Sequence, residues 1–217
     1  PRVFLHGVKI RRLSQPTHAH KVNFSKFTNG TSTGIEDATD KSGLRFVAAV
    51  NGACAGGGYE LALACDHIML IDDGSSTVSL PEFPLLAVLP GTGGLTRLVD
   101  KRKVRHDRAD YFCTTSEGIR GKRATDWDLV DEIVPRSKFD EVVANRAAEF
   151  AAESDRPANA KGVVLTPINR AARDAQIVYD NVKIDLDRDL AMATITISAP
   201  AEAPPTDISS IDAQGVD

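Results

Sequence analysis

The chain has 217 residues, enough for one large domain or two small ones with a substantial hydrophobic core. Its formal net charge is -4 with both signs interspersed, which indicates neither nucleic acid nor an anionic membrane surface as a partner. The 3 cysteines are too few and too scattered for a disulfide framework or a paired metal motif, and no apolar run approaches the roughly 20 residues of a membrane span. We therefore expect a cytoplasmic globular protein with no membrane segment and no metal.

The segment over residues 9–42 is polar, rich in Thr, Ser, Asn and Asp, and shows no sustained hydrophobic period. This composition predicts that most of the segment is loop. His18 and His20 form a His-Ala-His pair within it. Because no third ligand is near in the sequence, we interpret the pair as solvated rather than metal-binding.

A strand, a helix and a second strand are predicted next. The apolar runs "RFVAAV", Arg45–Val50, and "HIMLID", His67–Asp72, are typical of buried strands, and the helix formers of "YELALACD" lie between them. This order indicates a βαβ unit in an α/β fold. The following run, "TVSLPE", stops at Pro81, which places Glu82 at the end of a strand or in the loop after it.

Further segments carry simpler patterns. Residues 90–98 again place a glycine turn before a helix, and residues 124–134 and 139–152 carry apolar residues at the spacing of amphipathic helices. Residues 182–197 alternate on both sides of an Asp-Arg-Asp turn, which predicts a β-hairpin. The Pro- and Ala-rich residues 199–207 cannot continue a strand and are typical of an exposed linker.

Three consecutive glycines, Gly56 to Gly58, lie immediately before the predicted helix that holds Glu60. A helix that begins at glycines exposes bare N–H groups, and its dipole favours an anion there. With a transient anion, such as the oxygen of a polarised thioester, this end becomes an oxyanion hole. Glu60 lies one turn from Gly57, close enough to move a proton on the bound group. Glu82 supplies a second carboxylate, and two carboxylates in one pocket separate each other's titrations.

A structural interpretation of the same residues stays open from the pattern alone. The glycines then only allow close packing against a strand, and Glu60 only complements the helix dipole. The contiguous glycines do not fit the spaced dinucleotide fingerprint, and no phosphate-binding Lys-Ser/Thr follows them. Cys54, Cys65 and Cys113 lie in apolar surroundings and are interpreted as small core residues rather than nucleophiles.

Several motifs resemble one protein superfamily. The stretches "AAVNGACAGGGYELALACDHIMLID", "SLPEFPLLAVLPGTGGLTRL" and "RATDWDLVDEIVP" resemble the enoyl-CoA hydratase/isomerase (crotonase) superfamily from Phe46 to Pro135. The stretches "KVNFSKFTN", "DKRKVRHDRADYFC" and "EGIRGKRA" are most similar to the benzoyl-CoA-dihydrodiol lyase branch, from about Val3 to Pro200. The resemblance implies an α/β fold of the crotonase type, a spiral of ββα turns.

The resemblance also implies a set of site residues. Backbone N–H groups of Gly57 and Val8 are expected to hold the thioester oxygen, with Glu60 and Glu82 as the two catalytic glutamates. Val8 replaces the smaller Ala of the branch, and Leu5, His6 and Lys9 also depart from its pattern. Substrate contacts are further expected from neighbouring glycines, namely Gly56, Gly58, Gly91 and Gly93.

The implied reaction opens the ring of epoxybenzoyl-CoA by adding water and releasing formate. The substrate is an acyl-CoA, coenzyme A enters only as part of it, and no metal or other cofactor is implied. The intact protein is expected to be a homo-oligomer without nucleic-acid or membrane partners. A hydratase or isomerase acting on another acyl-CoA and a non-catalytic fragment remain alternatives. The basic residues 101–108 are expected to form a solvated helix face, and the alternative is that they contact the phosphates of coenzyme A.

The resemblance predicts how the chain is divided. Residues 1–160 are expected to form a partial crotonase-like acyl-CoA domain that is N-terminally truncated, and residues 161–181 a connecting segment. Residues 182–217 are expected to begin a second crotonase-like domain, with a hairpin and a Pro-rich tail. On this interpretation the chain is an internal fragment of a longer protein.

Overall fold

The computed structural model describes residues 3–6, 17–155, 159, 161, 167–201 and 203–214. The chain separates into two compact units, Pro1–Arg156 and Pro157–Asp217, which are treated in turn below. The division lies close to the predicted boundary after residue 160.

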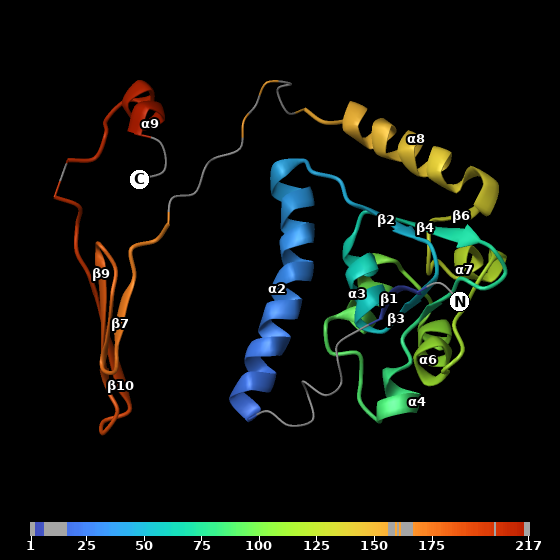
Figure 1. Ribbon diagram of the computed structural model, residues 1–217, viewed down its shortest axis with the longest axis horizontal. Coiled ribbons are helices and arrows are strands. Elements are labelled where there is room, and N and C mark those ends of the chain that lie inside the picture. The colour runs from blue at the N-terminus through green and yellow to red at the C-terminus, as the bar shows by residue number, and fades with distance from the viewer. Residues whose placement is uncertain are drawn as a thin grey trace. The chain divides into compact units, whose positions relative to one another are not determined.

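Two parallel three-stranded sheets form the framework of the first unit (Figure 1). One has the order β1-β3-β5 and consists of β1 (Val3–His6), β3 (Ala53–Ala55) and β5 (Val78–Ser79). The other has the order β2-β4-β6 and consists of β2 (Val47–Val50), β4 (His67–Asp72) and β6 (Glu132–Pro135). Parallel strands need crossover connections, and α3 (Gly57–Ala64) lies in the crossover that joins β2 to its parallel partner β4.

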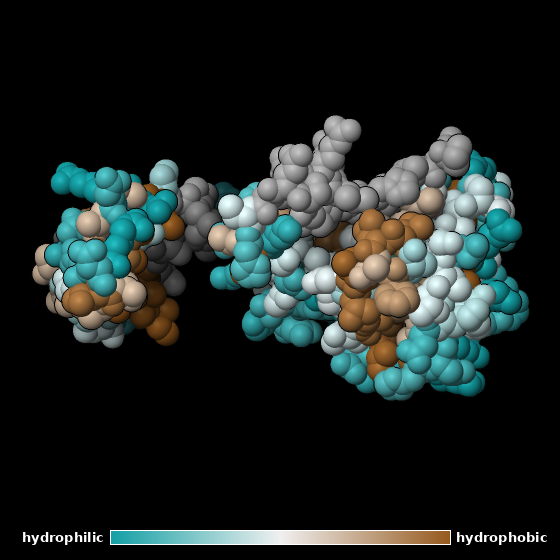
Figure 2. All heavy atoms as spheres, turned by 90° about the horizontal axis from the view of Figure 1, so that it is seen from below, coloured by the Kyte–Doolittle hydropathy of each residue, from teal (hydrophilic) through white to brown (hydrophobic). Residues whose placement is uncertain are grey.

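The other helices of this unit surround the sheets (Figure 1). They are α2 (His18–Ser42), α4 (Glu82–Leu86), α5 (Gly94–Thr96), the π-helical η1 (Arg97–Lys101), α6 (His106–Thr114), α7 (Lys122–Asp126), the 3-10 turn η2 (Arg136–Lys138) and α8 (Phe139–Ala152). Figure 2 shows an apolar patch on the face that carries α4 and the segment after it. Its exposed large side chains are Phe83, Leu85, Leu86, Val88 and Leu89.

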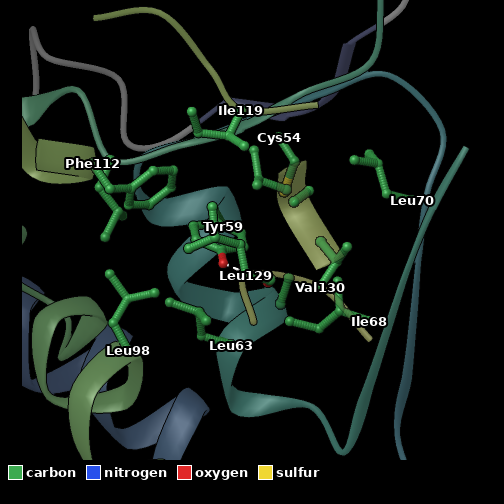
Figure 3. Packing of buried hydrophobic residues seen from close by; sticks show 14 of the residues in the cluster. Cys54, Tyr59, Leu63, Ile68, Leu70, Leu98, Phe112, Ile119, Leu129 and Val130 are labelled. Atoms are coloured by element: carbon green, nitrogen blue, oxygen red, sulfur yellow. Dashed lines mark hydrogen bonds between the residues drawn. The ribbon is translucent and has the colours of Figure 1, made fainter. Parts of the chain in front are cut away.

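The core of the first unit is built around α3, because this helix is apolar on nearly every side. Tyr59 is fully buried, donates a hydrogen bond of 2.6 Å from its hydroxyl to the Leu129 carbonyl, and meets the ring of Phe112 edge-on (Figure 3). Leu63 and Leu98 are also fully buried in this cluster. The packing fixes the orientation of α3, and with it the position of every residue at its glycine end.

The predicted loop over residues 9–42 is wrong for its larger part, because residues 18–42 form the long helix α2. Thr17 caps the helix by accepting from the His20 N–H, and Gly43 ends it in the left-handed conformation at φ +61°. The helix is polar nearly all round and Ser32 is its one fully buried residue, so hydrophobic periodicity gave no signal. Packing against α3 stabilises it.

The predicted amphipathic helix over residues 124–134 is also wrong. Helix α7 ends at Asp126, and Asp128 adopts a left-handed conformation at φ +59° that turns the chain. Leu129 and Val130 are buried after this turn, and Glu132–Pro135 pairs with β4. By contrast, the structure confirms the strand over residues 67–72 and the helix over residues 139–152.

The second unit contains an antiparallel sheet of order β10-β9-β8-β7. Its strands are β7 (Ala171–Arg173), β8 (Gln176–Val178), β9 (Val182–Asp187) and β10 (Met192–Ile197). The predicted hairpin over residues 182–197 is confirmed as β9 and β10. The predicted connecting segment instead contributes β7 and β8, because Gln176–Val178 pairs with β9. Helix α9 (Ile208–Gln214) follows the Pro-rich residues.

Candidate active site

Neighbouring parallel strands bring the candidate residues to one edge of the first sheet. In the register, Ala55 of β3 pairs with both His6 of β1 and Ser79 of β5. The glycine run follows β3 directly, and Glu82 follows β5 by three residues. Because the carboxyl ends of parallel strands meet at the same edge, residues distant in sequence meet there, as is usual for α/β sites.

The entrance to α3 leaves a backbone donor free. Gly56 has φ +57° and ψ -131°, a conformation that essentially only glycine adopts, and its N–H donates to the Ser79 carbonyl at 3.0 Å. Among the described residues, no acceptor takes the N–H of Gly57, the first residue of α3. Gly58 is buried inside the helix. Val8, the second predicted oxyanion donor, lies outside the described residues.

Glu60 is only 3% exposed, and three donors surround its carboxylate. The N–H groups of Thr92 and Gly94 both donate to Oε1 at 2.9 Å, and the Thr92 hydroxyl donates to Oε2. Gly94 has to be glycine here, because a Cβ at this position would lie 2.9 Å from Glu60 Oε1. The carboxylate is therefore turned away from the solvent and toward the glycine-rich turn.

Glu82 is the first residue of α4, so the strand end or loop expected at this position from the sequence is wrong. Its Oε1 lies against Gly56, where a Cβ would be 2.7 Å away. Its Oε2 is buried and has no hydrogen-bond partner among the described residues. Burial, together with the nearby charge of Glu60, raises the pKa of the Glu82 carboxyl. The two glutamates thus have contrasting surroundings, one rich in donors and one poor in them.

This contrast predicts a pH-dependent difference in stability between the wild type and Glu82→Gln. The pKa of Glu82 is higher in the folded chain than its ordinary 4.5, so the unfolded chain releases this proton first as the pH rises. The stability of the wild type therefore falls relative to the variant as the pH rises through and above 4.5. Denaturant unfolding of both proteins at acidic and mildly alkaline pH measures the difference in their free energies of unfolding. A difference that stayed the same at both pH values would contradict a raised pKa for the Glu82 carboxyl. Glu141→Gln, at an exposed position, serves as the control.

Four residues that the sequence reasoning did not single out complete the site. Thr92 donates to Glu60, and the Arg97 guanidinium donates to the Thr92 carbonyl at 3.0 Å. Asn29 donates to the Gly91 carbonyl at 3.3 Å, and Glu36 pairs with Arg97. Of these four residues, only Thr92 could have been noticed in the sequence. It lies between glycines in "PGTGG", where a hydroxyl is available for a polar contact.

The glycines of this turn have different surroundings. Gly93 has φ +84°, and a Cβ there would lie 2.5 Å from Arg97 Nη1, so it makes room for the guanidinium. Gly91 is exposed and contributes its carbonyl. The structure therefore gives Gly91, Gly93 and Gly94 roles in holding the turn beside Glu60.

The histidine pair and the cysteines lie outside the candidate site. His18 and His20 are exposed on the first turn of α2, and no group of three or more metal-ligating side chains was found in the described part of the chain. Cys54 and Cys113 are buried in the core as predicted, whereas Cys65 is partly buried against it. Burial raises the pKa of the Cys54 and Cys113 thiols to about 12 and also raises the pKa of Cys65.

The basic residues 101–108 do not form a single solvated helix face. They span the end of η1, a turn and the start of α6, and Lys101 donates to the Ala64 carbonyl at 2.7 Å. Arg102 pairs with Asp131 at 3.0 Å, and its side chain is 10% exposed. No helix among the described residues is both long enough and apolar enough to cross a bilayer.

Comparison with known proteins gives one family and a related group of structures. Residues 1–188 match the family described as enoyl-CoA hydratase/isomerase. The chain is 55% identical over 216 residues to the benzoyl-CoA-dihydrodiol lyase of Aromatoleum evansii, an alignment that covers 100% of this chain and 39% of the lyase. It is 39% identical over 121 residues to the fatty acid oxidation complex subunit alpha of Shewanella loihica, covering 56% of this chain and 16% of that protein.

The fold agrees with solved structures of the same kind. The crystal structure of an enoyl-CoA hydratase from Geobacillus kaustophilus superimposes with a TM-score of 0.62 at 32% identity, covering 70% of this chain and 54% of that one. The crystal structure of an enoyl-CoA hydratase from Bacillus anthracis superimposes with a TM-score of 0.57 at 28% identity, covering 66% of this chain and 52% of that one. The chain thus spans 39% of the length of the lyase and about half of these hydratases.

Proposed function

Because the chain belongs to the enoyl-CoA hydratase/isomerase family, we propose that its full-length protein is an acyl-CoA lyase that opens the ring of epoxybenzoyl-CoA. The reaction adds water and releases formate. The observation that carries the proposal is the pair of unlike glutamates, Glu60 and Glu82, at the glycine entrance of α3. The similarity to a benzoyl-CoA-dihydrodiol lyase favours this substrate among acyl-CoA thioesters.

In the proposed mechanism the N–H of Gly57, which has no acceptor among the described residues, donates to the thioester oxygen of the substrate. The dipole of α3 adds to this donor, so negative charge that develops on the oxygen is stabilised. Val8 is the proposed second donor. What supports this choice is that β1 ends at His6, which pairs with Ala55 immediately before the glycine run. The thioester can then accept electrons from the ring as an enolate.

The two glutamates divide the proton transfers in this mechanism. Glu60 accepts three hydrogen bonds and acts as the base that removes a proton from water. Glu82 holds its proton more firmly because it is buried beside another carboxylate, so it acts as the acid that protonates ring carbon or oxygen. The exposed apolar side chains that follow Glu82 on α4 provide a surface suited to an aromatic ring.

The proposal extends to the setting of the reaction. Water is added and formate leaves without net oxidation or reduction, so the proposed chemistry needs neither a redox cofactor nor a metal, and coenzyme A enters only with the substrate. We propose that the full-length protein works in the cytoplasm as a homo-oligomer. We also propose that residues 182–217 begin a second domain of the same family.

The proposed activity is tested by supplying epoxybenzoyl-CoA to the full-length protein and measuring formate enzymatically and the ring-opened thioester by mass spectrometry. Stoichiometric release of both products is expected. Crotonyl-CoA, offered in parallel, tests the second candidate, a hydratase, which the likeness to two enoyl-CoA hydratases favours. Turnover of crotonyl-CoA without formate from the epoxide would replace the lyase with the hydratase. Turnover of neither thioester would favour the non-catalytic alternative.

A further inference from the structure

The turn that carries Thr92 holds both oxygens of the Glu60 carboxylate. Thr92 donates twice, from its N–H to Oε1 at 2.9 Å and from its hydroxyl to Oε2, and Gly94 N–H is the third donor. The two backbone groups can only donate, and both point at Oε1, so this oxygen has to be an acceptor, while the Thr92 hydroxyl holds Oε2. The direction in which Glu60 points is thus determined by the position of this turn.

Arg97 in turn fixes the position of Thr92. Its Nη1 donates to the Thr92 carbonyl at 3.0 Å. The guanidinium reaches this position because Gly93 has no side chain, since a Cβ would lie 2.5 Å from Nη1. The Arg97 side chain is 11% exposed, so the contact is largely shielded from water.

Glu36, on α2, fixes Arg97. Its Oε1 accepts from Nε at 2.8 Å and its Oε2 from Nη2 at 2.7 Å, a two-pronged pair that sets the plane of the guanidinium. Lys101 adds a second cation at 3.2 Å from Oε1. Hydrogen bonding to Arg97 is the largest cause that lowers the pKa of Glu36, which keeps this carboxyl charged.

We propose that Glu36 and Arg97 are positioning residues for proton transfer by Glu60, acting through Thr92. The inference rests on the proposed function, in which Glu60 is the base. A purely structural ion pair that anchors α2 to η1 would affect the stability of the fold and leave the geometry around Glu60 unchanged. The two roles therefore differ in what a variant does to turnover and to the direction of the Glu60 carboxylate.

The first experiment compares Glu36→Gln with Asp37→Asn in the full-length protein. Gln presents a donor toward Nη2, so the two-pronged pair is lost while the size of the side chain is kept. We expect kcat to fall about tenfold with KM within about twofold, because a displaced base loses alignment rather than binding. Asp37 is the next residue on α2 and pairs with Lys41 at 2.9 Å in solvent, so Asp37→Asn is expected to leave both constants unchanged.

The second experiment isolates the link between the turn and Glu60. Thr92→Val removes the hydroxyl donor but keeps the N–H contact and the branched shape, and Thr92→Ser restores a hydroxyl. We expect Thr92→Val to lower kcat about tenfold and to move the acidic limb of its pH profile to higher pH, and Thr92→Ser to recover most of both. Unchanged kcat and pH profiles in Glu36→Gln and Thr92→Val, with an active wild type, would overturn the positioning role and leave the proposed function intact.

A crystal structure of the Glu36→Gln variant separates the two proposals when the wild type turns over no acyl-CoA. Displacement of Thr92 and of the Glu60 carboxylate from their wild-type positions would support the positioning role even if the proposed function failed. A Glu60 carboxylate that kept its contacts with Thr92 and Gly94 would overturn it, whatever the activity.

Discussion

Glu60→Gln is expected to lower turnover by the full-length protein about 100- to 10,000-fold, the usual contribution of a general base. Gln has the shape of Glu, and its carbonyl can still accept from the N–H groups of Thr92 and Gly94. Its amide nitrogen faces the Thr92 hydroxyl, which can rotate to accept. The variant should therefore fold and bind the thioester, so the loss should lie in kcat with little change in KM.

Steady-state formate release measures this effect, and circular dichroism checks the fold. Glu117→Gln, at an exposed position, controls for loss of a carboxylate in general. Turnover of the Glu60→Gln protein within about threefold of the wild type would remove Glu60 from the mechanism. A large rise in KM at unchanged kcat would instead assign Glu60 to substrate binding.

Gly56→Ala is expected to damage both stability and turnover. The backbone of Gly56 lies at φ +57°, and the new Cβ would lie 2.7 Å from Glu82 Oε1. The backbone strain should cost about 1 to 3 kcal/mol of the free energy of unfolding. Moving the Glu82 carboxyl by about 1 Å should lower turnover about 100-fold.

Gly121→Ala separates the two effects, because Gly121 is a close match in backbone geometry. It precedes α7 at φ +54° and ψ -151°, and no atom lies within 4 Å of its would-be Cβ. Similar losses in thermal unfolding but intact turnover in Gly121→Ala would assign the catalytic loss to Glu82. Equal turnover losses in both variants would show that strain alone accounts for it.

The sequence was informative about the centre of the first unit and much less so about what surrounds it. The strand at residues 67–72 and the helix at residues 139–152 show strong apolar patterns, and both were predicted with correct bounds. The prediction that Glu60 and Glu82 lie in one site came from the family resemblance. The residues alone left a structural interpretation open. Parallel pairing of β3 with β5 now gives its physical reason.

Helix α2 and the contact of Thr92 with Glu60 could not be predicted, because both depend on residues that are distant in the sequence. Helix α2 contains Gly30 and Gly34 and has no apolar stripe, so neither propensity nor period marks it. Its partners, such as Arg97, are far away in the sequence. The role of Thr92 likewise depends on a backbone turn that brings its hydroxyl back to α3.

The low burial of α2 would link the proposed catalysis to local unfolding. Ser32 is the one fully buried residue of this helix, whereas α3 is enclosed by the core. Elements with so little buried surface open at a lower free energy than the core does. Each such opening would take Glu36 away from Arg97 while the sheets and α3 stay folded. Heat inactivation of the site would therefore precede melting of the core, so the lifetime of activity would be determined by a surface helix.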